Sequence, residues 1–251
     1  MKNASLLLLA AGLFLGAAEF QELPQKYEFS HAKSACKNLG AEWRVPEIWE
    51  LFALKGETQK YGSDKRYWSA TELLEERELN IHTSSDESYI KKGEAKAFAF
   101  YLQDGDITPT PLFVKAHLLC TDTPKIEQSY SHLQQTKDGV KDTLNNLLWA
   151  SLPKGNERLS YEKANMACET SDYLGRSWRL PTLDELYSIV DYTKVKPSVD
   201  SELFERMASR YYWTQSEFSR SDAYVVGFSI GSVATVSKES ETFYRCVSEI
   251  E

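Results

Sequence analysis

Cysteine has the widest chemistry in this chain of 251 residues, which contains four: Cys36, Cys120, Cys168 and Cys246. A thiolate can be a nucleophile, a metal ligand or one half of a disulfide, and its pKa and neighbours decide which. The chain has no C-x-x-C, so the sequence predicts neither a thioredoxin-like redox pair nor a familiar zinc ribbon. In an oxidising compartment an even count favours disulfides, although spacing alone leaves three pairings open.

The four histidines form no recognisable catalytic pattern. They are His31, His82, His117 and His132. The chain also lacks H-E-x-x-H, G-x-S-x-G and a glycine-rich phosphate loop. We therefore expect no catalytic residue and no metal site from these side chains.

The nearest approach to a calcium motif is "QDGDITPT", in which Asp104 and Asp106 flank Gly105. Calcium prefers six to eight oxygen ligands, far more than this segment offers. A hairpin turn explains Asp-Gly better. We expect no cofactor; calcium stays an alternative that no motif supports.

Two arginines lie in the similar segments "EWRVPEIWEL" and "SWRLPTLDEL", at Arg44 and Arg179. A guanidinium group can bind a carboxylate or sulfate ligand bidentately. The alternative is an internal pair with Glu50 or Glu185, or hydrogen bonds to loop carbonyls. Because Trp and Pro flank the arginine both times, the sequence favours the internal role.

These two segments belong to a longer internal repeat, which is a strong indicator of architecture. "FSHAKSAC" precedes the first segment as "YEKANMAC" precedes the second, and "YWSATE" follows the first as "YWTQSE" follows the second. Residues 97–120 then align without a gap on residues 223–246. We interpret the chain as two copies of one unit, each with an early and a late cysteine. The economical pairing is Cys36 with Cys120 and Cys168 with Cys246.

Within each copy the periodicity predicts two helices followed by antiparallel strands, an α+β unit. The first helix has apolar residues at Phe29, Ala32 and Cys36, and a second helix opens with Pro46 or Pro181. Thr182 and Glu185 offer a capping box. "AFAFYL" and "AYVVGFSIG", which end in turn-forming residues, are typical of hairpin strands.

The copies differ at their beginnings. "VKDTLNNLLWA", residues 140–150, predicts a strand carrying a turn, which opens the second copy. We see no counterpart in the first copy, which would borrow an edge strand or lack one. The polar segment 123–138 is expected to be a linker between domains at 19–122 and 139–251.

The N-terminus, residues 1–18, has one lysine and then an uncharged apolar run ending in small residues, which predicts a cleaved signal peptide. The run is too short to span a bilayer, so we expect no membrane insertion. The net charge of −8 becomes −9 without Lys2, which disfavours nucleic-acid binding. We expect a periplasmic, secreted or surface protein of a bacterium.

Six ordered motifs in the second copy resemble the bacterial DUF1566 domain, also named for the C-terminal domain of a Legionella collagen-like adhesin (Lcl). They are "VKDTLNNLLWA", "YEKANMAC", "SWRLPTLDEL", "YWTQS", "AYVVGFSIG" and "YRCV". The first copy is a weaker match with a longer insert. That family is similar in fold to C-type lectins and to formylglycine-generating sulfatase-modifying factors.

The resemblance implies two tandem C-type-lectin-like domains, each with a disulfide from helix to last strand. The calcium-binding tripeptides of such lectins, Glu-Pro-Asn, Gln-Pro-Asp and Trp-Asn-Asp, do not occur here. Formylglycine-generating enzymes need a reactive cysteine pair, and two structural disulfides would leave none. The residues expected to form the scaffold are Trp43, Arg44, Pro46, Glu50, Trp68, Trp149, Trp178, Arg179, Pro181, Glu185 and Trp213.

Function is then expected in the loops that differ between copies, 73–96 and 195–212. Tyr212, Phe218 and Arg220 are the candidate ligand-binding residues. Our leading hypothesis is a non-enzymatic binding or adhesion protein with a protein or glycan ligand. The alternatives are an enzyme or modifying factor related to the formylglycine-generating group, and a structural component of an envelope complex.

Overall fold

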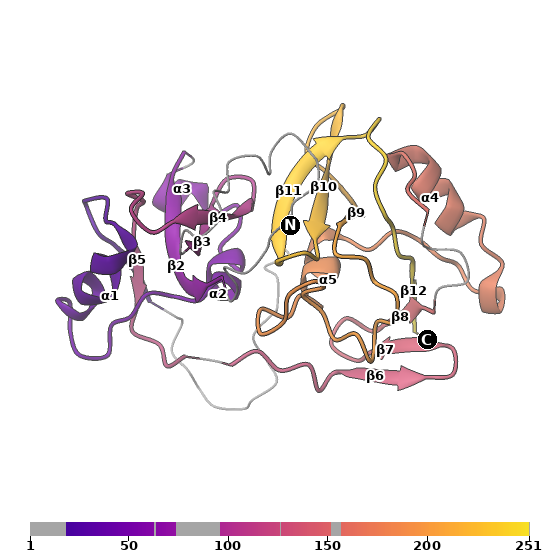
Figure 1. Ribbon diagram of the computed structural model, residues 1–251, viewed down its shortest axis with the longest axis horizontal. Coiled ribbons are helices and arrows are strands. Elements are labelled where there is room, and N and C mark those ends of the chain that lie inside the picture. The colour runs from indigo at the N-terminus through magenta and orange to yellow at the C-terminus, as the bar shows by residue number, and fades with distance from the viewer. Residues whose placement is uncertain (1–18, 63, 74–95, 126, 152–156, 251) are drawn as a thin grey trace. The chain divides into compact units, whose positions relative to one another are not determined.

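The computed structural model describes residues 19–62, 64–73, 96–125, 127–151 and 157–250. The chain forms two compact units, unit 1 (Met1–Ile126) and unit 2 (Glu127–Glu251). Each mixes short helices with antiparallel strands, in agreement with the expected α+β class (Figure 1). The expected signal peptide, 1–18, and nearly all of the insert 73–96 lie outside the described residues.

Unit 1 contains two small sets of paired strands. Its elements are β1 (Phe20–Glu22), α1 (Phe29–Lys37), α2 (Ile48–Phe52), α3 (Thr58–Tyr61), β2 (Arg66–Glu72), β3 (Lys96–Tyr101), β4 (Ile107–Pro111) and β5 (Leu119–Thr121). Strand β3 pairs antiparallel with both β2 and β4, and β1 pairs antiparallel with β5. The pairing of β1 corrects our expectation that the first copy borrows or lacks an edge strand.

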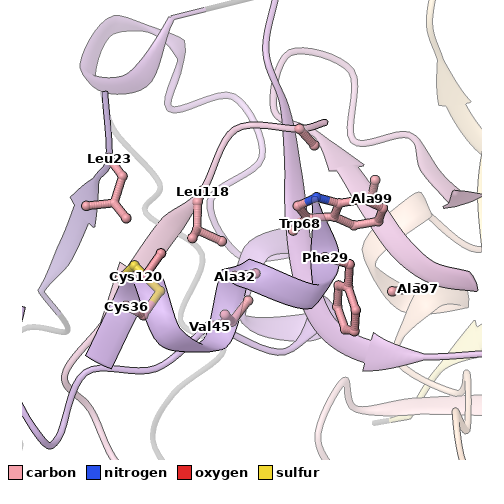
Figure 2. Packing of buried hydrophobic residues seen from close by; sticks show 12 residues of the cluster. Leu23, Phe29, Ala32, Cys36, Val45, Trp68, Ala97, Ala99, Leu118 and Cys120 are labelled. Carbon is pink, nitrogen blue, oxygen red and sulfur yellow. A yellow bond between two sulfur atoms is a disulfide. The ribbon is translucent and has the colours of Figure 1, made fainter. Parts of the chain in front are cut away.

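The core of unit 1 forms where the apolar face of α1 meets the strands. Ala32 and Cys36 are fully buried on this face, as their spacing predicted, and the Phe29 ring packs edge-on against Trp68 at 5.4 Å between centroids (Figure 2). Cys36 is bonded to Cys120 on β5, so the disulfide fixes the helix to the last strand of the unit. This confirms the first expected pairing.

Unit 2 has the same kinds of element and two more strands at its start. Its elements are β6 (Leu133–Thr136), β7 (Gly139–Asp142), β8 (Leu147–Ala150), α4 (Tyr161–Glu169), the 3₁₀ helix η2 (Tyr173–Gly175), α5 (Leu183–Tyr187), β9 (Tyr211–Glu217), β10 (Asp222–Gly227), β11 (Ser232–Ser237) and β12 (Val247–Glu249). Strand β10 pairs with β9 and β11, and β6, β7, β8 and β12 pair in that order, all antiparallel.

The core of unit 2 again forms under a helix with a buried cysteine. The Tyr161 ring packs edge-on against Trp213 at 5.5 Å, and Cys168 is bonded to Cys246, which confirms the second expected pairing. The predicted strand with a turn is the β7–β8 hairpin. Strand β6, however, lies inside the range 123–138 that we expected to be a linker. This strand was not predicted because most of its residues are polar and not buried, and pairing with β7 stabilises it.

Two local predictions at turns and helix starts had different outcomes. Gly105 has φ +78° and donates its N–H to the Tyr101 carbonyl, so "DGD" is a hairpin turn as expected. The prolines do not open the second helices, which corrects our interpretation. Those helices begin two residues later, because the carbonyls of Pro46 and Pro181 accept hydrogen bonds from the strand residues Ala70 and Gln215, each at 2.7 Å.

Candidate functional site

Arg44 is fully engaged inside unit 1. Its Nη1 and Nη2 donate to the two carboxylate oxygens of Glu50 at 2.7 and 2.6 Å, a bidentate pair. Its Nε and Nη2 donate to the carbonyls of Thr123 and Pro124. The internal role is therefore confirmed, and the guanidinium ties α2 to the segment that follows β5.

Arg179 makes the corresponding bonds in unit 2. It donates to both carboxylate oxygens of Glu185 at 2.7 and 2.9 Å and to Glu249 Oε1 at 2.6 Å. Burial alone would raise the pKa of Glu185, but the hydrogen bonds from Arg179 and Thr182 outweigh it and lower that pKa. The predicted capping box is confirmed, because Glu185 also accepts the Thr182 N–H at 2.7 Å.

The scaffold tryptophans are structural in their surroundings. Trp68, Trp149 and Trp213 are fully buried, Trp178 is 3% exposed, and Trp43 is partly buried. The indole N–H groups of Trp68 and Trp213 donate to the carbonyls of Tyr27 and Leu159. Such satisfied, buried rings anchor the core.

The three candidate ligand-binding residues do not lie on one surface. Tyr212 is 1% exposed; its ring stacks on Phe243 and packs edge-on against Phe228, both at 5.5 Å. The expectation that Tyr212 lines an exposed surface with Phe218 and Arg220 is wrong, because its strand position points the ring into the core. Phe218 is 48% exposed and Arg220 is exposed, and both belong to the β9–β10 turn.

The β9–β10 turn is held by its own side chains. The hydroxyls of Ser219 and Ser221 donate to Asp222 Oδ2 at 2.8 and 2.6 Å, and these bonds lower the pKa of the Asp222 carboxyl. The Phe218 N–H donates to the Asp222 carbonyl, and the Phe218 ring packs edge-on on Tyr224 at 5.7 Å. The turn thus holds the Phe218 ring against Tyr224 and carries the exposed Arg220 two residues later.

The second candidate loop, 195–212, is folded rather than free. Val199 and Phe204 are fully buried, and the Ser198 N–H donates to the Phe228 carbonyl at 2.7 Å. Lys196 and Arg206, both exposed, adopt φ +56° and +60°. Left-handed backbone is costly for residues other than glycine and clusters at functional segments, so this loop stays a candidate binding surface.

A polar cluster in unit 1 was missed by sequence analysis. Glu22 accepts hydrogen bonds from Lys65 at 2.7 and 2.8 Å and from the Tyr67 hydroxyl at 3.0 Å, and His117 Nδ1 lies 3.7 Å from the same carboxylate. Burial, followed by the charges of Lys26 and Lys65, lowers the pKa of His117. Glu22 is far from Lys65, Tyr67 and His117 in the sequence, and the pairing of β1 with β5 brings it to them. No sequence motif could therefore have indicated this cluster.

Arg245 in unit 2 was also missed. It is 3% exposed, its Nε donates to the Ala150 carbonyl at 3.2 Å, and its guanidinium lies over the Phe204 ring at 5.0 Å. The sequence alignment of the two units contained the signal, since Arg245 before Cys246 aligns with Leu119 before Cys120. An arginine therefore stands in unit 2 at the position of a buried leucine in unit 1.

All four cysteines are bonded in the two disulfides, so none is a free thiol. Among the described residues, no three His, Cys, Asp or Glu side chains converge in a way that could hold a metal ion. In the same part of the chain, no helix has the length and apolarity needed to cross a membrane.

Comparison with known families matches residues 138–248 to the Lcl C-terminal domain. The match lies within unit 2 and confirms the resemblance that we drew from six motifs in this region. No match was found among curated proteins. The interpretation of residues 19–122 as a first copy stays a prediction.

Proposed function

We propose, from the match of residues 138–248 to the Lcl C-terminal domain, that this chain is an exported, non-enzymatic binding or adhesion protein. In this proposal residues 1–18 are a cleaved signal peptide, and the mature protein lies in the periplasm or on the surface of a bacterium. Two C-type-lectin-like units present loops to a protein or glycan ligand.

The tandem arrangement is supported by equivalent contacts in the two units. The Arg44 backbone pairs with Thr121 and the Arg179 backbone with Val247, in each case the residue after the last cysteine. Tyr67 bridges to His117, four residues before Thr121, and Tyr212 bridges to Phe243, four residues before Val247. Residues that align in the repeat therefore occupy the same positions relative to each unit's last strand.

The observation that carries a binding role is the β9–β10 turn. Phe218 and Arg220 are exposed on a turn that Asp222 holds in place, and aromatic and arginine side chains dominate the energetic centres of binding surfaces. A side chain held in one arrangement loses little entropy on binding. If both units engage one partner, the tandem adds avidity.

The rival hypothesis of a formylglycine-generating type of enzyme needs reactive thiols, and all four sulfurs are in disulfides. The other rival, a structural component of an envelope complex, predicts a fixed protein partner without glycan binding. These two hypotheses and the binding proposal therefore differ in measurable ways.

The test compares two double variants of the mature chain, on glycan arrays and in pulldowns from the native envelope fraction. Phe218→Ala with Arg220→Ala should reduce ligand capture at least tenfold, which corresponds to about 1.4 kcal/mol. The matched control, Phe113→Ala with Arg158→Ala, removes one exposed aromatic and one exposed arginine elsewhere and should retain binding.

Equal capture by both variants would contradict the role of the β9–β10 turn. Capture of one stoichiometric envelope protein, with no glycan bound and no effect of either variant, would favour the structural-component hypothesis. A reactive thiol detected after the purified protein is denatured without reductant would restore the enzyme hypothesis.

A further inference from the structure

Arg245 is a buried cation whose hydrogen-bonding capacity is not filled. Its Nη1 is buried and has no hydrogen-bond partner, while its Nε donates to the Ala150 carbonyl at 3.2 Å. Within the described part of the chain, no Asp or Glu forms an ion pair with it. A buried charge without a carboxylate or a full set of acceptors is costly, and most buried guanidinium groups are paired.

The hydroxyl of Tyr212, a buried residue of the same unit, keeps a hydrogen to donate. Tyr212 Oη accepts the Ala208 N–H at 2.7 Å, and among the described residues no acceptor receives its own O–H. Burial raises the pKa of Tyr212, while the Ala208 hydrogen bond and the positive charge of Arg245 lower it. Arg245 and Tyr212 are thus both buried, and each keeps a donor hydrogen that has no acceptor among the described residues.

Aromatic rings surround the Arg245 guanidinium and the Tyr212 ring. Phe204 lies 5.0 Å from the guanidinium and packs edge-on against Trp149 at 5.8 Å. Tyr212 lies between Phe228 and Phe243. A cation and a hydroxyl inside an aromatic shell favour a ligand that is negatively charged, accepts hydrogen bonds and is small.

From this geometry we propose that Arg245, with the Tyr212 hydroxyl, forms a binding site for a small monovalent anion, either a halide or a small carboxylate. The anion neutralises the guanidinium and accepts from Nη1 and Oη. Because Phe204 belongs to the loop 195–212, the bound anion also stabilises that loop against the body of unit 2. The site is specific to unit 2, since Leu119 takes the corresponding place in unit 1, where it is fully buried.

The test measures the thermal midpoint of the mature chain at constant ionic strength, with sodium gluconate exchanged stepwise for sodium chloride or sodium formate. Gluconate serves as the bulky reference anion. Above the Kd of the anion that binds, the wild type should gain roughly 4 °C in Tm for each tenfold increase in the free concentration of that anion. The salt that produces the rise, chloride or formate, identifies the chemical source of the anion.

Three variants separate this site from general salt effects. Arg245→Leu, which copies unit 1, should lose the anion dependence and keep or exceed the wild-type Tm in gluconate. Tyr212→Phe should weaken the dependence, and Arg158→Leu, at an exposed arginine of the same unit, should retain it in full. The proposal would be overturned if Tm rose equally with anion concentration in the wild type and Arg245→Leu. It would also be overturned if the Tm of the wild type responded to neither anion.

A second measurement does not depend on folding of the variants. Crystals of the wild-type protein soaked in bromide or grown in formate should show an anion beside Arg245 Nη1. Anions bound only at the surface, or only water at Nη1, would equally overturn the site.

Discussion

Unit 1 and unit 2 fix the second helix to the last strand with equivalent bonds, yet they differ in what surrounds those bonds. Arg44 and Arg179 each make a bidentate pair with the glutamate six residues later. The third partner differs: backbone carbonyls after β5 in unit 1, and the Glu249 carboxylate in unit 2. The arginine therefore has a constant structural task, and only the outer partner varies.

A second position shows a larger difference. Tyr67 and Tyr212 align in the repeat and both follow the long segment after the second helix. Tyr67 lies in a polar cluster with Glu22 and Lys65, whereas the Tyr212 ring stacks on Phe243 and packs edge-on against Phe228. Two aligned tyrosines thus have different surroundings: an ion pair in unit 1 and aromatic rings in unit 2.

Removing a disulfide gives the largest expected effect and tests whether the units are independent. The bridges span 84 and 78 residues, so the chain-entropy model gives each about 4.5 kcal/mol. Cys36→Ala with Cys120→Ala should destabilise unit 1 by that amount, and Cys168→Ala with Cys246→Ala should destabilise unit 2 equally. Hydrogen exchange read by mass spectrometry reports each unit separately. An equal loss of protection in both units from one pair would show that they unfold together.

The arginine pairs come next in size. Arg44→Ala and Arg179→Ala should each cost about 2 kcal/mol, because each leaves a largely buried glutamate without its partner. In unit 2 the cost should also depend on pH: the lowered pKa of Glu185 adds stability above its unfolded pKa, and that stability is lost as pH falls through the folded pKa. Denaturant titrations between pH 7 and pH 3 measure both effects.

The Arg179→Ala variant provides the control for this pH dependence, since it removes the main hydrogen bonds that lower the Glu185 pKa. Its stability should fall less steeply with acid than that of the wild type. A variant with an unchanged acid slope would mean that the Thr182 hydrogen bonds alone determine the pKa of Glu185.

Similar sequence segments in the two units explain why so much could be predicted from one sequence. Helix α1, helix α4, both disulfides and the Arg–Glu pairs follow from local periodicity and from residues that recur in the same order. Strand β1 could not be predicted, because three residues carry no period and owe their conformation to pairing with β5. Tyr212 was misplaced for a related reason: its burial depends on Phe228 and Phe243, which are distant in sequence.

The smallest effect concerns backbone strain, which also separates the units. In the described ranges, the four non-glycine residues with positive φ are all in unit 2: Asn146, Leu174, Lys196 and Arg206. Leu174 has φ +57° and ψ +14° and is 45% exposed. Burial of its side chain therefore offsets little of the free-energy cost of this left-handed backbone conformation. Leu174→Asn should stabilise unit 2 by about 0.5 kcal/mol, because asparagine tolerates this conformation.

Met166→Asn is the matched control for Leu174→Asn, because Met166 is 61% exposed but lies within helix α4. It should destabilise unit 2 by about 0.5 kcal/mol through lower helix propensity. Chemical denaturation of both variants beside the wild type resolves the opposite signs. If Leu174→Asn also destabilises, the buried half of the leucine outweighs its strained backbone, and strain alone does not explain why leucine occupies this turn of unit 2.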